Sequence, residues 1–203
     1  MPRPLAAPVP LSAVPTSKSF TKKLQARRLL PQLMAGVRHS FAGTVSTVDE
    51  LASGTLFSFA DWPNDLVPRR AAGVYTIWRA DDFIYVGMSG RGAQSEDFVV
   101  GDGQPAQAKG LWTRLGSHAS GRRSGDQFNI YICDRFIVPT LTSAQQIQIS
   151  HGDLLLDQMT RSYIREHLGY RFTICADGTE ALAVEHAVRS GALPTGRPYL
   201  NPL

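Results

Sequence analysis

The stretch that decides the fold is GVYTIW at residues 73–78, followed by FIYVGM at residues 83–88. Both segments are rich in aromatic and β-branched residues, which favour strands, and only the polar residues 79–82 separate them. Two such runs joined by a short polar connection predict a β-hairpin. Each strand of this hairpin carries one tyrosine, Tyr75 on the first and Tyr85 on the second.

The register of the hairpin determines whether the two tyrosines share a face. A three-residue turn over residues 80–82 would pair Ile77 with Tyr85 and Tyr75 with Gly87. Tyr75 and Tyr85 would then be diagonal neighbours on one face, and Gly87 would leave open space opposite Tyr75. A two-residue turn would instead move the tyrosines to opposite faces.

Residue patterning after the hairpin predicts alternating helices and strands. The expected elements are a helix over residues 105–120, a strand over 128–138, a helix over 154–168, a strand over 170–176, and a last helix capped by Thr179 and ended by Gly191. This order predicts an α+β fold, with a small mixed or antiparallel sheet that starts with the hairpin and is flanked by helices.

The N-terminal third differs in composition from the rest of the chain. Residues 1–16 contain five prolines and predict a disordered arm, whereas residues 17–70 predict a helical extension. The extension carries a basic cluster formed by Lys22, Lys23, Arg27 and Arg28. This cluster is either a solvated helix face or an arm that contacts nucleic-acid phosphates. We place the main domain at residues 71–203.

Charge and composition narrow the class of protein. The net charge is +4, and nine basic and four acidic residues precede residue 71, against twelve and thirteen after it. A positive N-terminal segment is compatible with a polyanionic partner. No apolar run approaches the roughly 20 residues of a membrane span. Cys133 and Cys175 predict buried free thiols in a reducing compartment, so we expect a cytoplasmic protein with no membrane partner.

Charged residues interrupt the apolar faces of two predicted helices. Arg114 and His118 share a face with Leu111 and Leu115, where the guanidinium must find an anion or extend to solvent. Glu185 lies likewise on the face formed by Ala181, Val184 and Val188. A buried carboxylate needs a partner, either Arg114 in a structural ion pair or a bound divalent cation.

These residues together resemble the GIY-YIG nuclease superfamily. The signatures Gly73-Val74-Tyr75 and Tyr85-Val86-Gly87 correspond to the family's paired signatures. The family's helical arginine, metal-binding glutamate and late asparagine correspond in order to Arg114, Glu185 and Asn201. The resemblance runs from Gly73 to the C-terminus and implies the fold, the activity and the catalytic set.

Two details bear on the subfamily. His118, one helical turn after Arg114, resembles the restriction-enzyme branch. Many members have a lysine after the second signature, where this chain has Met88 and Ser89. The resemblance therefore implies a DNA endonuclease with restriction-like cleavage, lacking one charge near the phosphate.

The resemblance implies a role for each residue of the site. Glu185 would hold Mg²⁺ or Mn²⁺, Arg114 would bind the non-bridging phosphate oxygens, and Tyr75 would be the general base. Tyr85 and His118 would orient the water and the scissile phosphate, and Asn201 would position Glu185 or the metal's waters. A phenol titrates near 10, so Tyr75 would need a cationic neighbour or transient deprotonation.

Several functional alternatives stay open at this point. Arg122 and Arg123 are assigned to DNA binding together with the N-terminal basic cluster. A double-strand cut would require a homodimer or sequential nicking. The competing class is a non-catalytic nucleic-acid-binding module that retains the nuclease fold, and a third is an interaction protein in which Arg114 and Glu185 form a structural pair.

Overall fold

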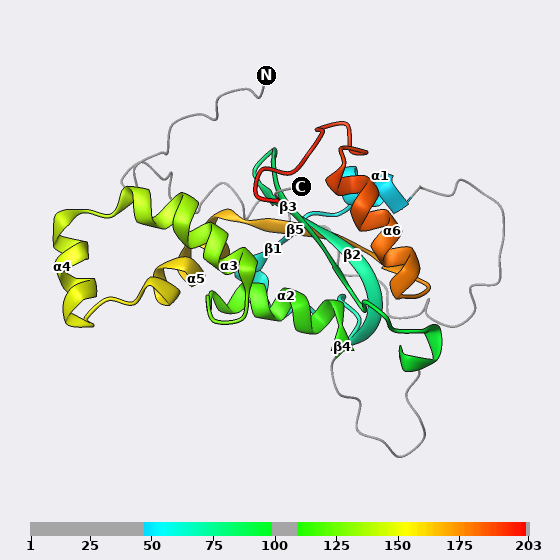
Figure 1. Cartoon of the computed structure of the whole chain (residues 1–203), viewed down its shortest axis with the longest axis horizontal. Helices are drawn as coiled ribbons and strands as arrows, with labels where there is room; N and C mark the ends of the chain where they lie inside the picture. The colour runs from blue at the N-terminus through cyan, green and yellow to red at the C-terminus, as the bar shows by residue number, and fades with distance from the viewer. Residues whose placement is uncertain (1–46, 99–108, 202–203) are drawn as a thin grey trace, which may run out of the picture. The chain divides into compact units, whose positions relative to one another are not determined.

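An antiparallel sheet of four strands forms the centre of the structure, a computed structural model that describes residues 47–98 and 109–201 (Figure 1). The strand order is β1–β5–β2–β3, and a short fifth strand, β4, pairs in parallel with the start of β2. The strands are β1 (Phe57–Ser58), β2 (Arg70–Arg79), β3 (Asp82–Ser89), β4 (Lys109–Gly110) and β5 (Gly169–Cys175). The expected α+β class and the hairpin β2–β3 are confirmed, but the sheet starts with β1 and not with the hairpin.

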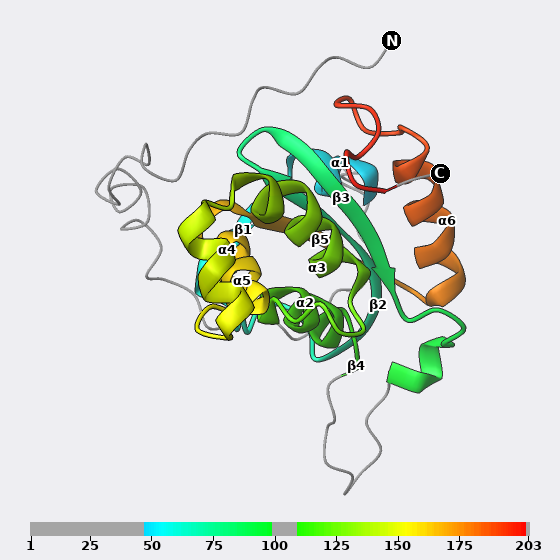
Figure 2. The same cartoon turned by 60° about the vertical axis from the view of Figure 1, so that its left-hand side comes forward.

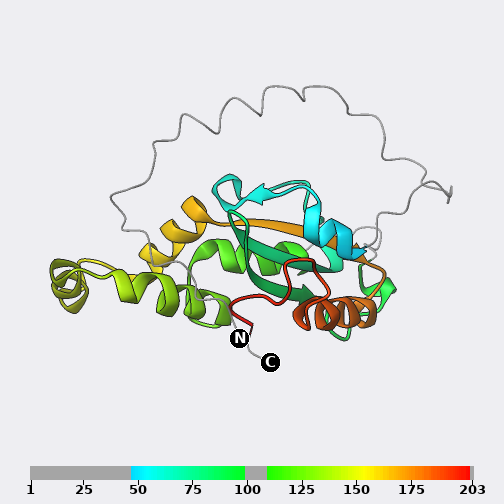
Figure 3. The same ribbon diagram turned by 90° about the horizontal axis from the view of Figure 1, so that it is seen from above.

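Helices cover both faces of the sheet (Figure 2). One face packs against α2 (Leu111–Ser120), α3 (Gln127–Ile132) and α5 (Leu156–His167), and the other against α1 (Thr47–Ser53) and α6 (Gly178–Arg189). The remaining helix, α4 (Ser143–His151), has no buried residue and extends away from the sheet (Figure 3). Among the described residues, no helix is both long and apolar enough to cross a bilayer.

The alternation of side chains along β2 divides the core into two clusters. Tyr75 and Ile77 pack toward α2, α3 and α5, while Val74 and Trp78 pack toward α1 and α6. All four side chains are at most 3% exposed, so β2 is buried on both faces. The continuous apolar run in the sequence follows from this central position.

A β-bulge sets the register of the hairpin. The predicted three-residue turn is wrong, because the loop is only Ala80 and Asp81. Nevertheless Ile77 pairs with Tyr85 and Tyr75 with Gly87, as predicted, because Ile84 is an extra residue in β3. Ile84 and Tyr85 consequently face the same cluster, and the two tyrosines share one face.

The predicted strand over residues 128–138 is wrong. This segment is α3, which continues as a π-helix (Cys133–Ile137) and a short 3₁₀ turn (Val138–Thr140). Its aromatic and branched residues favoured a strand, but Phe128 and Ile132 are buried at helical spacing against the sheet. Tertiary packing here overrides the local preference.

Other boundaries follow the prediction more closely. The helix over 154–168 and the strand over 170–176 are confirmed as α5 and β5. The helix expected over 105–120 begins only at Leu111, after β4. The last helix is capped by Asp177, whose side chain accepts hydrogen bonds from the backbone N–H groups of Thr179 and Glu180, so Thr179 is not the cap.

The N-terminal boundary also differs from the one expected near residue 70. Leu51 in α1 and Phe59 in the 3₁₀ turn Phe59–Asp61 are fully buried in the compact unit Val45–Leu203. Residues 47–69 are therefore part of the main domain. The predicted arm and basic helix, with Lys22, Lys23, Arg27 and Arg28, lie outside the described residues. A further 3₁₀ turn, Ser95–Phe98, follows β3. Cys133 and Cys175 are free, buried thiols, as predicted.

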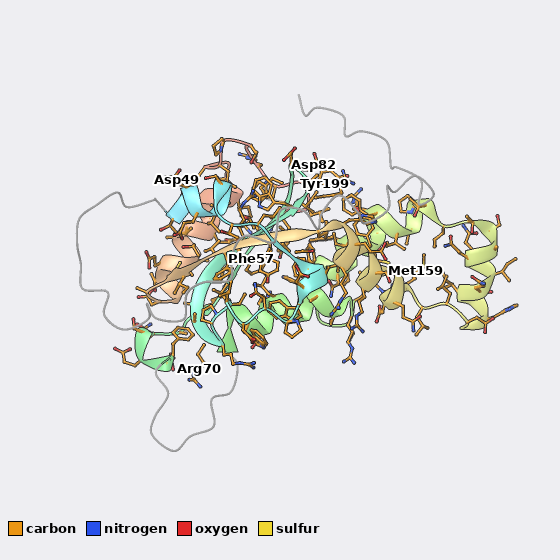
Figure 4. All side chains as sticks on the ribbon, turned by 180° about the vertical axis from the view of Figure 1, so that it is seen from behind. Asp49, Phe57, Arg70, Asp82, Met159 and Tyr199 are labelled. Carbon is orange, nitrogen blue, oxygen red and sulfur yellow. The ribbon has the colours of Figure 1, made fainter. Side chains whose placement is uncertain are left out.

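The C-terminal tail covers the exposed edge of β3. The backbone N–H groups of Tyr199 and Leu200 donate to the carbonyl oxygens of Phe83 and Ile84. Figure 4 shows Tyr199 beside Asp82 at the loop end of the hairpin. The tail therefore occupies the place of a further strand, which protects an edge that would otherwise leave its backbone groups unpaired.

Asn201 completes this edge with its side chain. Its Oδ1 accepts a hydrogen bond from the Val86 N–H at 2.8 Å, and its Nδ2 donates to the Val86 carbonyl at 2.9 Å. The carboxamide of Asn201 thus takes the place of a backbone peptide group opposite Val86, the middle residue of the signature Tyr85-Val86-Gly87.

Replacing Asn201 with alanine should lower the free energy of unfolding by about 1–2 kcal/mol, because two hydrogen bonds to Val86 are lost. Urea unfolding of the full chain measures the change. The control is Arg197→Ala, which removes one exposed hydrogen bond to the Ser190 carbonyl in the same tail and should change stability by less than about 0.5 kcal/mol. Equal effects of the two substitutions would contradict a special role for the carboxamide.

Candidate active site

A cavity of about 690 Å³ lies beside the edge strand β3, between α2 and α6. Five of the six predicted catalytic residues line it, namely Tyr75, Tyr85, Arg114, Glu185 and Asn201. The sixth, His118, is buried behind Tyr75 and only 1% exposed. The structure therefore brings together residues that are spread over more than a hundred positions of the sequence.

Gly87 makes room for the tyrosine pair. A Cβ atom at position 87 would overlap the hydroxyl group of Tyr75 and approach the Tyr85 ring. The two rings lie 6.4 Å apart between centroids, on the face that packs against α2. The predicted open space opposite Tyr75 is confirmed, and the phenol of Tyr75 fills it.

A chain of buried hydrogen bonds runs inward from the cavity. The Tyr75 hydroxyl lies 2.7 Å from Nε2 of His118, and Nδ1 of His118 lies 2.7 Å from Oδ2 of Asp126. The hydroxyl of Ser117 donates to the same carboxylate oxygen at 2.7 Å. The other oxygen of Asp126 accepts the backbone N–H of Phe128 and so caps α3.

The protonation states in this chain follow from burial and hydrogen bonding. Burial lowers the pKa of His118, so the imidazole is neutral at pH 7. Burial opposes ionisation of Asp126 as well, but hydrogen bonds from His118 and Ser117 outweigh it and hold the carboxyl pKa below its usual value. The carboxylate accepts the Nδ1 proton, which leaves the Nε2 lone pair of His118 free to accept the Tyr75 hydroxyl.

The phenols themselves are neutral at rest. Burial raises the pKa of Tyr75 well above its usual value of 10, and burial raises that of Tyr85 to about 12. The positive charge of Arg114 acts in the opposite direction on both groups. Arg114 is solvent-exposed at the cavity wall, so its guanidinium extends out of the apolar face of α2. Of the two alternatives that the sequence offered, an anionic partner or extension to solvent, this is the second.

Glu185 reaches the cavity from the opposite side of the sheet. Its side chain is mostly buried, and its nearest cation is Arg189, with Nη1 at 3.6 Å from Oε1. The sequence left two partners open, Arg114 or a divalent cation. Within the described part of the chain, Arg114 forms no ion pair with Glu185, and an (i, i+4) contact within α6 provides the positive charge instead.

Positive charge dominates the wall around Glu185. Arg91 and Arg189 line the cavity together with Arg114, and of the described residues that line it, Glu185 is the only one with a carboxylate. Met88 and Ser89 also line it, and Arg91 follows them closely in the sequence. Arg91 thus brings a cation to the region where the expected lysine is missing.

The donor set defines what kind of metal ion could bind. Within the described residues there is no group of three or more His, Cys, Asp or Glu side chains suited to a metal ion. A lone carboxylate at an open cavity fits Mg²⁺ better than it fits zinc. Mg²⁺ retains several waters in protein sites and uses substrate oxygens as ligands. The contact between Glu185 and Arg189 is longer than a hydrogen bond and leaves both oxygens of the carboxylate able to accept.

Two further predicted residues that the structure describes, Arg122 and Arg123, lie outside the cavity. Arg123 forms an ion pair with Asp157, with Nε 2.7 Å from Oδ1, and so ties the segment after α2 to α5. Arg122 is adjacent and does not line the cavity. Asp126 was missed by sequence reasoning, although its place one residue before an aromatic-rich helix is the signal of an N-cap.

Comparison with known proteins adds no assignment. No protein-family model matches the chain, and neither the curated proteins nor the solved structures give a significant match. The geometry and charge of the cavity are therefore what point to a function.

Replacing Gly87 with alanine should lower the free energy of unfolding by about 1–3 kcal/mol, because the new methyl group displaces the phenol of Tyr75 from His118. The matched control is Gly116→Ala in α2. There the nearest atom to a new Cβ is in the Trp62 ring at 3.4 Å, and alanine favours a helix by about 1 kcal/mol. Denaturant unfolding should give opposite signs for the two variants, and equal destabilisation would contradict the proposed contact.

Acid should destabilise the protein through His118. Its pKa is lowered in the folded state, so the unfolded chain binds the proton first, and stability is lost as the pH falls below about 6.5. Asp126, whose pKa is also lowered, should add a further loss below about pH 4. The steepest slope from one histidine is about 1.4 kcal/mol per pH unit.

Measuring the free energy of unfolding between pH 8 and 4 tests this pH dependence. His167 has a lowered pKa for the same reason, so the informative quantity is the difference between wild type and His118→Gln. This variant should show a flatter profile between pH 7 and 5, whereas His186→Gln, at an exposed position, should not. Parallel profiles for all three proteins would refute the buried neutral state of His118.

Proposed function

We propose that the chain is a divalent-metal-dependent DNA endonuclease that hydrolyses phosphodiester bonds and resembles the GIY-YIG superfamily, in particular its restriction-like branch. The observation that carries this proposal is the series of hydrogen bonds that joins Tyr75, His118 and Asp126. It ends at a cavity lined by three arginines and one glutamate.

Phosphate binding is supported by the charge of the cavity. Three guanidinium groups, from Arg91, Arg114 and Arg189, face a single carboxylate. A planar guanidinium can donate two parallel hydrogen bonds to phosphate oxygens, and its charge stabilises the negative charge that develops on them. The cavity is open to solvent, as a polymeric substrate requires.

The hydrogen-bond chain would supply a route for the proton of the attacking water, once a water molecule reaches the hydroxyl of Tyr75, whose side chain lines the cavity but is fully buried in the resting structure. Tyr75 can accept this proton only if its own hydroxyl proton leaves, because burial keeps the phenol neutral. The neutral His118 can take that proton at Nε2, and the Asp126 carboxylate then stabilises the imidazolium. Water thus transfers a proton to Tyr75 while Tyr75 transfers its own to His118, so the phenolate need not accumulate.

A metal ion would be held by Glu185 and by oxygens of the substrate. When bound, Mg²⁺ or Mn²⁺ would polarise the scissile phosphate and neutralise the leaving oxygen. Arg189 keeps the Glu185 side chain directed along α6 toward the cavity. Asn201 acts on the site through β3, because its two hydrogen bonds fix Val86 next to Gly87 and Tyr85.

A non-catalytic DNA-binding module is the second candidate. The contact between Arg189 and Glu185 favours it, since the ion pair already provides the carboxylate with a partner. Such a module would bind DNA in a salt-dependent manner and leave it intact.

Plasmid cleavage distinguishes the two candidates. The wild-type chain with Mg²⁺ or Mn²⁺ should nick or cut plasmid DNA, and Glu185→Gln should reduce the rate on the order of 10²–10³-fold. Gel electrophoresis followed over time measures both rates. The matched control is Glu166→Gln, at a side chain 62% exposed on α5, which should retain the wild-type rate.

The result that would refute the nuclease is equal cleavage by wild type and Glu185→Gln, or binding without cleavage across linear, supercoiled and single-stranded DNA. Salt-dependent binding without cleavage would establish the second candidate instead. Sequencing the cut ends would show whether one or both strands are cleaved, and therefore whether a homodimer is required.

A further inference from the structure

A second, smaller cavity adjoins the catalytic one. Its volume is about 270 Å³, and it is lined by Tyr131, Arg135, Tyr199, Leu200 and Asn201. Asn201 lines both cavities, so they share a wall. Tyr131 is also close enough to Tyr85 for the two phenols to interact electrostatically. The two cavities are therefore neighbours that meet at Asn201.

The side chains of this second cavity are not explained by core packing. Tyr199 is 44% exposed, Arg135 is exposed, and Tyr131 is only partly buried. Yet Tyr199 is held in position. Its backbone is bound to Phe83, and its ring lies 6.1 Å from the ring of Phe136. An aromatic ring fixed by its backbone and kept open to solvent is available to a ligand without a large loss of side-chain entropy.

The chemistry of the cavity suits a nucleobase. Two phenol rings and a guanidinium surround a space that is small compared with a pocket for a whole cofactor. Unstacked bases are bound by stacking on tyrosine rings and guanidinium planes, which tolerate any base. Because the arginine-lined cavity and the aromatic one share Asn201, a phosphate bound in the first would leave a base of the same strand close to the second.

We propose that the second cavity, formed by Tyr131, Arg135 and Tyr199, binds one unstacked base next to the scissile phosphate. This proposal depends on the proposed nuclease function and refines its substrate class. Extruding a paired base costs a few kcal/mol and costs least at a mismatch or an unpaired nucleotide. The preferred substrate is then DNA in which the nucleotide next to the cut is unpaired or mismatched.

The test begins with cleavage sites mapped for the wild type. Duplexes are then made with a mismatch, an abasic site or 2-aminopurine at each nucleotide flanking the mapped bond. On the mismatched duplex, Tyr199→Ala should raise KM on the order of tenfold, because base stacking is lost. Tyr199→Phe, which keeps the ring, should recover most of the affinity, and Arg197→Ala in the same tail is the matched surface control.

The abasic duplex separates base binding from a structural role. Wild type and Tyr199→Ala should have the same KM on it, because the base that the ring would contact is missing. A binding measurement with the 2-aminopurine duplex and Glu185→Gln should show a change in fluorescence at one flanking position, and this change should disappear when Tyr199→Ala is added.

The outcomes distinguish the two proposals. A wild type that neither binds nor cleaves DNA would overturn the nuclease and the base site together. Normal cleavage with no effect of Tyr199→Ala would overturn the base site alone. So would a KM increase that persists on the abasic duplex, or 2-aminopurine fluorescence that is unchanged at both flanking positions.

Discussion

The pairing of Tyr75 with Gly87 is the constraint on which the rest of the site depends. Because Gly87 has no side chain, the phenol of Tyr75 can lie across β3 and still reach His118 on α2. This pairing exists only because the extra residue Ile84 compensates for a short hairpin loop. Without the bulge every side chain of β3 beyond it would change faces, and Tyr85 would point toward α6.

The buried hydrogen bonds that lead from Tyr75 through His118 to Asp126 stabilise the fold and also define the protonation states of the candidate site. Asp126 caps α3 with one carboxylate oxygen and holds His118 and Ser117 with the other, so the same residue positions a helix and sets a protonation state. Buried polar groups are costly when unpaired, and satisfied networks fix a single arrangement. The segment between α2 and α3 is therefore held by interactions that also orient the imidazole toward Tyr75.

The parts of this arrangement that depend on local residue pattern could be predicted from the sequence. Alternation along the hairpin and charged residues on apolar helix faces located Tyr75, Tyr85, Arg114 and Glu185, which line one cavity. The bulge was missed because Ile84 is a β-branched residue suited to any position of a strand, so the sequence does not mark it as an extra residue. Asp126 was missed because the residues after it have strand-like composition, and a strand has no N-cap.

The topology of the sheet explains why the cavity lies where it does. Arg114 and Glu185 come from helices on opposite faces, so their side chains can share a space only beyond an edge strand. The edge is β3. Within the described residues, the tail is hydrogen-bonded to this edge as far as Asn201, which lines the larger cavity. The tail also brings Tyr199 to this edge beside Tyr131. A cationic cavity and an aromatic one thus meet at Asn201, which is the arrangement that the proposed binding of a phosphate and of a base projecting from the same strand requires.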